Sequence, residues 1–504
     1  MWGSFLFLHQ MKNKSPFLFN SLFFLCLMVI GIYSSWIISH LELQSYDEAR
    51  VLLSAWEMQK SGDWIGITYH GKLDHIMVKP PLFTWLAALS FKVFGFHEWA
   101  GRLPSMLFGF GTLILFYLFL LSIIKDYVLS ILISVGLAIS FAFIGQHGIT
   151  SGEYDSTLNF FVLLSFISIY KLFFEQKGKW VYLLAISLGL GFMTKSILGL
   201  LPMASILPAY FLNRGNSIRI AVPTFTKAIM LFTAIVFPYM IIREMRYQEH
   251  YLLLLFQVDV FTNMTHAILG HEGSMFYYLK LIKVVFKEWS AMFFVAFVFY
   301  SFYLLNKGNL RIRLHKPLNK TILFMLFPVV FYLVIFTLAR FKAIWYMNAM
   351  LPMMTLFTSI VLTAFIKENY RWLLYAILTV IVFYEGRNLY IHDQDRMNRD
   401  YETMTKNILL PNKAIMMDKS VISCDSLMPA SWNFGMMPSS LAYIDIFSGG
   451  RHTILKSYEG LNEHIVTKMD FDLVIVADTS KLLHKDQLNL VAAKDKMGMY
   501  AIKR

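Results

Sequence analysis

Two pairs of carboxylates follow long apolar runs, at points where the chain would leave a membrane. Asp47 and Glu48 come after the first run, and Glu153 and Asp155 come after the third. Charge is costly near hydrocarbon, so ionisable side chains at the ends of spans usually mark a place where a polar molecule is bound or converted. A carboxylate placed there can deprotonate or orient a hydroxyl or an amine.

Both pairs also have an ordinary structural interpretation. Ser45 and Glu48 fit the capping-box pattern S-x-x-E at the start of a predicted helix, whose dipole favours the anionic form of Asp47. Asp155 follows a tight turn and enters a span, which it can cap. The residue types alone therefore leave capping and catalysis open for each pair.

Two lysines suit a phosphate group. Lys79 precedes Pro80-Pro81 at a predicted lipid–water boundary, where a compact ammonium fits a phosphate head group. Lys195 lies between two apolar runs with almost no loop, so its charge needs a partner or an anion. The alternatives are a snorkelling lysine and a short exposed turn.

Two later segments place polar and aromatic side chains together. One contains His271 near Tyr277, in an arrangement whose aromatic faces suit carbohydrate rings, and the other contains Lys342 near Tyr346. A solvated histidine and the usual aromatic belt of membrane proteins are the alternatives. The neighbours Asp74 and His75 lack a third ligand at regular spacing and are weak evidence for a metal site.

The composition shows what positions these residues. Of 504 residues, 57% are hydrophobic and 15% are charged, which is too apolar for a water-soluble domain of this length. The net charge is +13, but many of the basic residues lie in short loops between apolar runs, which is typical of topology signals rather than of nucleic-acid binding. The two cysteines, Cys26 and Cys424, indicate neither a disulfide framework nor a thiolate metal site.

Apolar stretches of about the length that crosses a bilayer predict about eleven spans. We place them at 17–39, 103–123, 128–146, 157–174, 180–194, 196–212, 222–243, 287–305, 321–339, 345–365 and 371–386. The basic loops then fall on one side, which is predicted to be cytoplasmic, and both acidic pairs fall on the opposite face.

Three further elements are predicted outside the spans. Alternating apolar and charged residues at 46–60 predict a helix along the membrane surface, and the run 80–96 predicts an interfacial segment. Residues 387–504 are more polar and predict a soluble α/β domain, with strands at 441–446, 473–477 and 499–502. The predicted boundaries are therefore 1–386 for the membrane domain and 387–504 for the soluble domain.

The order of these motifs resembles the membrane glycosyltransferases with a GT-C fold. The chain is similar to the bacterial branch related to lipid A aminoarabinose transferases and protein O-mannosyltransferases. The resemblance rests mainly on Asp47-Glu48-Ala49-Arg50 and Lys79-Pro80-Pro81-Leu82, with support from Gly152-Glu153-Tyr154-Asp155, Thr194-Lys195, and His271 followed by Phe276-Tyr277-Tyr278. It implies a polyprenyl-phosphate-linked sugar as donor and inversion at the anomeric carbon.

The resemblance also implies roles for individual residues. Asp47 matches the catalytic aspartate of the first outer loop, and Lys79 matches the lysine beside the lipid phosphate. Asp155 with Glu153 matches the acidic second outer loop, and Lys195 and His271 match positions near the carrier phosphate and the donor pocket. Val78 stands where many relatives have glutamate, so no metal or acceptor role is taken over from that position.

The sequence thus predicts a glycosyltransferase in the bacterial inner membrane, with its active site and its C-terminal domain outside the cytoplasm. The acceptor is an envelope lipid similar to lipid A, a glycan or a protein, and a transporter or flippase of lipid-linked sugars is the alternative. No cofactor is implied with certainty, and a divalent cation stays an open option. The predicted site comprises catalytic Asp47, Glu153 and Asp155; donor-binding Arg50, Lys79, Lys195, His271, Lys342 and Tyr346; and, toward the acceptor, Glu48 and Tyr277.

Overall fold

The computed structural model describes residues 16–503 apart from several gaps. The gaps are 44–45, 76–77, 146, 214–221, 266–272, 275, 286, 307–315, 399–407, 418, 425–437, 456–457, 468–469, 477–478 and 495–496. The chain forms two compact units. The first contains residues 1–40, 76–86 and 102–393, and the second contains residues 41–75, 87–101 and 394–504.

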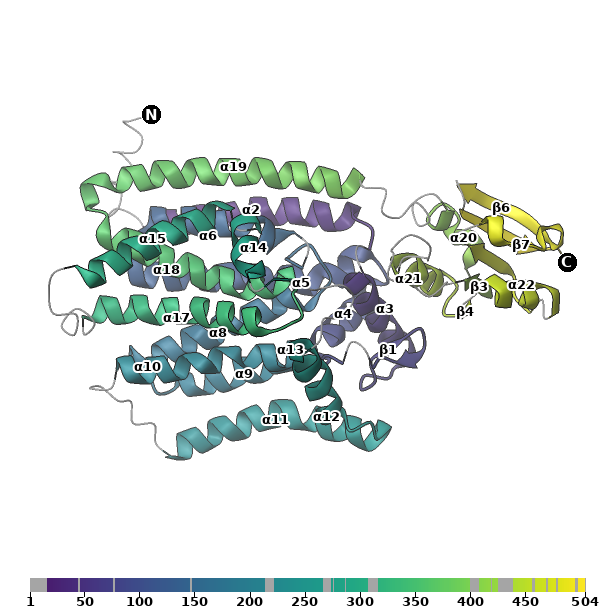
Figure 1. The fold of residues 1–504 in the computed structure, drawn as a ribbon, viewed down its shortest axis with the longest axis horizontal. Coiled ribbons are helices and arrows are strands. Elements are labelled where there is room, and N and C mark those ends of the chain that lie inside the picture. The colour runs from purple at the N-terminus through teal and green to yellow at the C-terminus, as the bar shows by residue number, and fades with distance from the viewer. Residues whose placement is uncertain are drawn as a thin grey trace. The chain divides into compact units, whose positions relative to one another are not determined.

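The first unit is a bundle of helices (Figure 1). In chain order its elements are α2 (Pro16–His40), α5 (Glu98–Ile124), α6 (Tyr127–Ile139), α7 (Phe141–Ile144), α8 (Tyr154–Phe173), α9 (Trp180–Lys195), the 3-10 helix η2 (Ser196–Ser205), α10 (Ile206–Leu212), α11 (Val222–Tyr247), α12 (Tyr251–Phe256), the π-helix η4 (Gln257–Thr262), α13 (Asn263–Thr265), α14 (Tyr277–Val285), α15 (Lys287–Leu305), α17 (Pro317–Leu338), the 3-10 helix η5 (Ile344–Met350), α18 (Leu351–Phe365), the short 3-10 helix η6 (Glu368–Tyr370) and α19 (Arg371–Asn398). The first four residues of α5 and the last five residues of α19 belong to the second unit.

Within the described residues, seven helical stretches are long and apolar enough to cross a membrane. They are 16–40, 98–124, 154–173, 180–212, 222–247, 317–338 and 344–365, and each overlaps a predicted span or, for 180–212, two of them. The other predicted spans fall on the shorter apolar helices α6 and α15 and on α19. Two helices begin at residues that favour a helix start. The Asp126 side chain caps α6 by accepting a hydrogen bond from the Leu129 backbone N–H, and Pro317 is the first residue of α17.

The stretch 180–212 reverses direction between Lys195 and Ser196. A Cβ added to Gly199 would lie 2.1 Å from the carbonyl carbon of Gly191, an approach that residues eight positions apart in one continuous helix do not make. Ser196 has a φ of 46°, a left-handed backbone that L-residues rarely adopt. Lys195 therefore lies at the tip of a helical hairpin, as the short break between the two apolar runs indicates.

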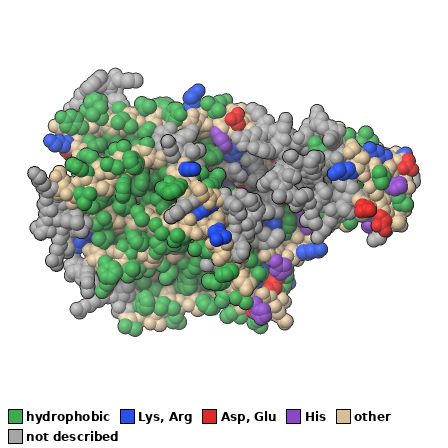
Figure 2. Space-filling view, in the orientation of Figure 1, with side chains coloured by type: hydrophobic (Ala, Val, Ile, Leu, Met, Phe, Trp, Pro, Cys, Tyr) green, Lys and Arg blue, Asp and Glu red, His purple; other side chains and the backbone are tan. Residues whose placement is uncertain are grey.

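The outer surface of the bundle is apolar. Large hydrophobic side chains such as Phe237 and Ile241 on α11 and Phe294 and Phe302 on α15 are exposed. Figure 2 shows hydrophobic side chains spread over the visible face of these helices, with few charges among them. Such a surface is expected for helices that contact lipid, and the protein is a multi-pass membrane protein.

The second unit combines the first predicted outer segment with the C-terminal domain. It contains α3 (Tyr46–Ser61), the hairpin β1 (Thr68–Tyr69) and β2 (Lys72–Leu73), most of α4 (Leu82–Phe94), and the tail elements α20 (Lys413–Met416), β3 (Val421–Cys424), α21 (Pro438–Phe447), β4 (His452–Leu455), α22 (Tyr458–Thr467), β5 (Leu473–Val476), the 3-10 helices η8 (Thr479–Lys481) and η9 (Lys485–Gln487), β6 (Leu488–Lys494) and β7 (Met497–Ile502).

The tail forms a five-stranded mixed sheet in the order β4-β3-β5-β7-β6. The β4, β3 and β5 strands are parallel, and β7 pairs antiparallel with both β5 and β6. Its core contains Ile422, Val474 and Val476 from the strands, with Leu461 and Ile465 from α22. The tail thus has the α/β composition that the sequence predicts.

One local prediction was wrong. Residues 441–446, predicted as a strand, lie in helix α21, which begins at Pro438, a favoured residue for a first helical turn. The predicted helix at 46–60 is present as α3, and its residues from Glu48 to Ala55 are buried. The leucine side chain at position 52 packs near Gly101, and α21 lies against α3.

Candidate functional site

The predicted site residues are divided between the two units. The first unit contains Glu153, Asp155, Lys79, Lys195, Lys342, Tyr346 and Tyr277, and the second contains Asp47, Glu48 and Arg50. His271 lies outside the described residues.

The start of α8 brings the second acidic pair into the first unit. Glu153 is the N-cap residue but makes no capping hydrogen bond with its side chain, and Asp155 lies in the first helical turn. Both side chains are buried. The positive end of the helix dipole favours two anions here. Capping by a side-chain hydrogen bond therefore does not explain Glu153.

Lys195 is the direct partner of Asp155. Its ammonium lies 2.7 Å from Asp155 Oδ1, and both side chains are buried. The same ammonium lies 5.6 Å from the centre of the Tyr346 ring. The structure thus brings together three of the residues that the sequence nominates, Asp155, Lys195 and Tyr346, although they are far apart in the chain.

His147 is a member of this cluster that the sequence analysis did not single out. Its Nδ1 forms an ion pair with Glu153 and lies 3.3 Å from Asp155 Oδ2. The Trp345 ring stacks on its imidazole with centroids 4.0 Å apart. Like Ser196, His147 has a positive φ, of 59°. Strained backbone is common at functional sites, so both residues strengthen the assignment of this place as a site.

A second group of charges adjoins the first through Ser196. Lys79 forms an ion pair with Asp259 of η4, and the Ser196 hydroxyl donates to the other oxygen of the same carboxylate. The backbone beside Lys79 is held by Tyr251, whose hydroxyl donates to the Val78 carbonyl at 3.1 Å. Asp259 was also missed from the sequence, because nothing in the apolar run around it indicates a partner for Lys79.

The two groups together are balanced in charge. With His147 protonated they hold three carboxylates and three cations, all with largely buried side chains: Glu153, Asp155, Asp259, His147, Lys195 and Lys79. Buried ion pairs of this kind rarely stabilise a fold more than apolar packing would. Their presence therefore favours a role in binding or chemistry.

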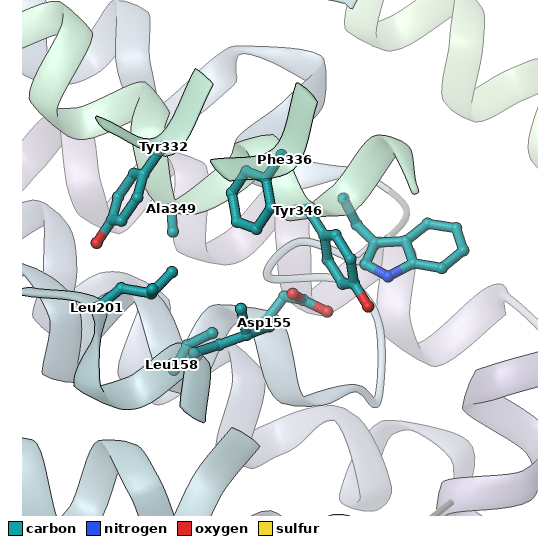
Figure 3. Close-up of a pocket in the computed structure, with 9 residues that line it drawn as sticks. Asp155, Leu158, Leu201, Tyr332, Phe336, Tyr346 and Ala349 are labelled. Atoms are coloured by element: carbon teal, nitrogen blue, oxygen red, sulfur yellow. The ribbon is translucent and has the colours of Figure 1, made fainter. Parts of the chain in front are cut away.

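A small pocket opens beside Asp155. Figure 3 shows the Asp155 carboxylate and the Tyr346 hydroxyl at one end of the pocket, with Leu158, Leu201 and Tyr332 toward the other end. The pocket has room for about one water molecule. A mostly apolar lining with the Asp155 carboxylate and its lysine partner at one end suits an amphiphile with a phosphate group, but a ligand of that size requires the pocket to widen.

Lys342 and Tyr277 contact other residues than those of this cluster. The Lys342 ammonium donates to the carbonyls of Phe336, Thr337 and Ala339 at 3.0, 2.7 and 2.5 Å, and so caps the C-terminal end of α17. Tyr277 opens α14 and packs edge-on against Tyr278. The contacts of Lys342 thus explain its burial without a ligand.

The predicted residues of the second unit differ in their environments. Arg50 is buried and donates Nε and Nη2 to the two carboxylate oxygens of Asp74, each at 2.6 Å, while its guanidinium stacks on Tyr69. This bidentate pair ties α3 to the hairpin. Glu48 is buried, whereas Asp47 is half-exposed in the first turn of α3. Of the three, Asp47 is the most accessible to a substrate.

A divalent cation has one candidate place in the described part of the first unit. One ligand atom each from His147, Glu153 and Asp155 lies within 4.8 Å of the others. The Lys195 ammonium on Asp155 opposes a second positive charge there. The group therefore suits an internal ion-pair network better than a metal.

The protonation of His147 gives the first testable prediction. Burial alone lowers the pKa of its imidazole, but the charge of Glu153 and the hydrogen bonds to Asp155 and Glu153 raise the pKa to about 10. Since the pKa of unfolded histidine is about 6.5, the stabilisation is complete below about pH 6.5 and is lost as the pH rises toward about 10. We expect the difference in melting temperature between wild type and His147→Gln to be largest below pH 6.5 and to shrink steadily up to pH 10. A difference independent of pH would contradict this protonation.

Comparisons with known proteins support the predicted fold. A family model described as dolichyl-phosphate-mannose-protein mannosyltransferase matches residues 78–242. An uncharacterized protein of Aquifex aeolicus is 27% identical over 247 residues, covering 48% of this chain and 47% of the relative. The undecaprenyl phosphate-alpha-4-amino-4-deoxy-L-arabinose arabinosyl transferase of Wigglesworthia glossinidia brevipalpis is 32% identical over 185 residues, covering 36% of this chain and 32% of the relative. The chain thus matches about half or less of the length of these curated relatives.

Two solved structures extend the similarity to almost the whole chain. ArnT from Cupriavidus metallidurans bound to undecaprenyl phosphate matches with a TM-score of 0.71 and 15% identity, over 97% of this chain and 98% of that chain. The oligosaccharyltransferase of Archaeoglobus fulgidus matches with a TM-score of 0.51 and 10% identity, over 91% of this chain and 70% of that chain. The resemblance to the GT-C glycosyltransferases and the predicted fold class are thereby confirmed.

Proposed function

We propose that this chain is a glycosyltransferase that moves a sugar from a polyprenyl-phosphate carrier to an envelope acceptor. The observation that carries the proposal is the buried, charge-balanced cluster around Lys195 and Lys79, beside a mostly apolar pocket with the Asp155 carboxylate at one end. A phosphate joined to a lipid likewise combines a charged group with an apolar tail. The undecaprenyl phosphate bound to ArnT and the undecaprenyl phosphate sugar in the name of the Wigglesworthia relative favour this class of donor.

Donor binding in this proposal is an exchange of anions. Lys79 is paired with Asp259 and Lys195 with Asp155, so each ammonium already has a carboxylate partner in this arrangement. In this proposal the entering phosphate replaces a carboxylate as a partner of one or both lysines. Because the pocket now has room for about one water, the exchange requires η5 and η2, which supply most of its lining, to move apart.

The transfer itself is a displacement at the anomeric carbon. The acceptor hydroxyl or amine attacks from the side opposite the phosphate, and its bond to carbon forms as the carbon–oxygen bond to phosphate breaks. The electron pair leaves with the carrier phosphate, the acceptor proton passes to a carboxylate, and the configuration inverts. From the motif resemblance and its half-exposed position, we assign that carboxylate to Asp47.

The lysines then act mainly by placement and by charge. Phosphate is already a good leaving group, and fixed cations stabilise the charge that develops on it. Asp155 and His147 hold Lys195 in place, and Asp259 holds Lys79 until the donor arrives. We assign Glu153 and His147 as positioning residues.

The anion exchange predicts opposite changes in the KM for the donor in two variants. Lys79→Gln removes a charged contact to the phosphate, which is worth about 1.5–3 kcal/mol, and should raise the KM for the donor roughly 10- to 100-fold. Asp259→Asn removes the competing anion and should lower that KM. Steady-state kinetics on purified protein measure both, with the exposed Lys92→Gln as the matched control. A rise in KM for Asp259→Asn would show that Asp259 supports donor binding instead of competing with it.

The proposal places the reaction on the extracytoplasmic face of the bacterial inner membrane. The basic loops predict this orientation, and a lipid-linked donor presented there meets envelope lipids, glycans and proteins. Cysteine labelling in intact cells at positions near Asp47 and Asp155 tests it. Labelling of these positions only after the membrane is permeabilised would contradict it.

The experiment that separates an enzyme from a transporter is mass spectrometry of the envelope. If the protein is a glycosyltransferase, cells that lack it should lose one glycosylated envelope product. They should also accumulate the polyprenyl phosphate that carries the sugar of that product. Wild-type protein should restore the product, and Lys195→Gln protein should not. Flipping of a lipid-linked sugar in liposomes that contain only this protein, with no glycosylated product in cells, would favour the transporter instead.

A further inference from the structure

A second cluster of ligand-type side chains lies in the second unit, among residues that the proposed transfer reaction does not use. It consists of His70 in the β1–β2 hairpin, Asp445 on α21 and His452 at the start of β4. One ligand atom from each residue lies within 4.8 Å of the others. The hairpin and the tail elements are separated by more than 350 positions in the sequence.

The geometry of the cluster is that of one carboxylate between two imidazoles. His452 Nδ1 lies 2.9 Å from Asp445 Oδ1, and His70 Nδ1 contacts Asp445 Oδ2. The two rings are nearly perpendicular, with centroids 6.3 Å apart. In tetrahedral Zn²⁺ sites the bonds are about 2.0–2.2 Å long, so ligand atoms are about 3.4 Å apart. The cluster needs only small shifts to reach that spacing.

Backbone and hydrogen bonds hold each histidine in place. His70 and Gly71 both have positive φ, 53° and 71°, as the tight turn of this two-residue hairpin requires. The Ser423 hydroxyl lies 2.6 Å from His452 Nε2, which leaves Nδ1 directed at Asp445. A hydrogen bond from the second ring nitrogen is the usual support of a metal-bound histidine.

The cluster is largely buried, and hydrogen bonds satisfy only part of it. His70 Nε2 is buried and has no hydrogen-bond partner among the described residues. The His452 side chain is fully buried, and Glu57 is close enough to affect Asp445 electrostatically. A buried carboxylate needs a compensating charge, and a divalent cation between the two imidazoles would supply one.

We propose that His70, Asp445 and His452 form a binding site for a single Zn²⁺ ion. Two imidazole nitrogens and a carboxylate oxygen form a ligand set that zinc prefers, and a fourth position is left for water. The ion ties the hairpin to α21 and β4 and stabilises the second unit. This role is independent of the transfer reaction and of the charge cluster in the first unit.

The test measures zinc in the full-length protein, purified in detergent through a tag without histidine. After treatment with a chelator and dialysis, wild-type protein should bind about one Zn²⁺ per chain in titration calorimetry, and its melting temperature should rise on addition of ZnCl₂. His70→Gln keeps a hydrogen-bond donor near Asp445 but removes a ligand nitrogen. We expect it to bind zinc at least ~100-fold more weakly and to lose the rise in melting temperature.

Two further variants test whether zinc binding depends on this cluster and not on other histidines. His464→Gln changes another histidine of the second unit, which pairs with Asp470 outside the cluster, and should bind zinc as wild type does. His147→Gln changes the acidic cluster of the first unit and should also retain zinc. Absence of zinc binding by wild type, equal binding by His70→Gln, or loss of zinc only in His147→Gln would each overturn the proposal.

Discussion

Replacing Asp47 with asparagine is expected to reduce sugar transfer by roughly 10³-fold or more while leaving the fold intact. The amide keeps the size and position of the side chain but cannot take a proton from the acceptor, and general-base catalysis contributes about 10²–10⁴-fold. Because Asp47 is half-exposed in the first turn of α3, its replacement leaves no buried charge without a partner. Turnover of a labelled polyprenyl-phosphate sugar by purified protein measures the effect.

The matched control is Asp470→Asn, which changes an exposed aspartate of the same unit and should leave turnover unchanged. Donor affinity separates the role of Asp47 from a binding role. Asp47→Asn should bind the donor about as tightly as wild type does, so kcat falls while KM stays nearly constant. Normal turnover by Asp47→Asn would remove the assignment.

The second large effect is expected at the buried pair of Lys195 and Asp155. Lys195→Gln leaves the buried cluster with three carboxylates and only two cations, and breaking such a pair costs about 3–5 kcal/mol of stability. It also removes a cation from the leaving phosphate, for which a loss of roughly 10²–10³-fold in kcat is expected. Both losses should appear in the single variant.

The double variant Lys195→Gln, Asp155→Asn separates the two effects. A neutral amide pair has no unpaired charge, so the melting temperature should return toward the wild-type value while transfer stays lost. A double variant that regains transfer together with stability would show that the pair serves only the fold. Thermal unfolding and turnover measured on the same preparations decide between these outcomes.

The sequence predicted the elements better than it predicted the contacts. Apolar length identified the spans, and the short break at Lys195 correctly indicated a charge that needs a partner. Hydrophobic length and burial cost are local properties, which can be seen in one sequence. The confirmed fold class follows from them together with the motifs.

The partners of the charged side chains were less predictable, because they come from distant parts of the chain. His147 lies in a short loop with no ligand spacing around it, and Asp259 stands alone in an apolar run. Asp74, considered with His75 as a weak metal pair, instead accepts two hydrogen bonds from Arg50. Such pairings depend on tertiary packing, which periodicity does not reveal.

Helix and strand were confused where both patterns fit. Residues 441–446 are rich in residues that favour strands, but they lie in α21, where the consecutive residues Ala442, Tyr443 and Ile444 are buried on different sides of the helix. Packing of this kind overrides local propensity. The same limit applies to Lys342, whose capping of α17 depends on how the chain turns after that helix.

The most direct test of the central claim is a turnover experiment with purified protein, an envelope lipid extract and a sugar-labelled polyprenyl phosphate of defined anomeric configuration. The account predicts that free polyprenyl phosphate and a glycosylated product appear in equal amounts, with the sugar inverted, and that Lys195→Gln lowers the rate of both by roughly 10²- to 10³-fold. Sugar that stays on its carrier throughout, or a product that retains the anomeric configuration, would contradict it.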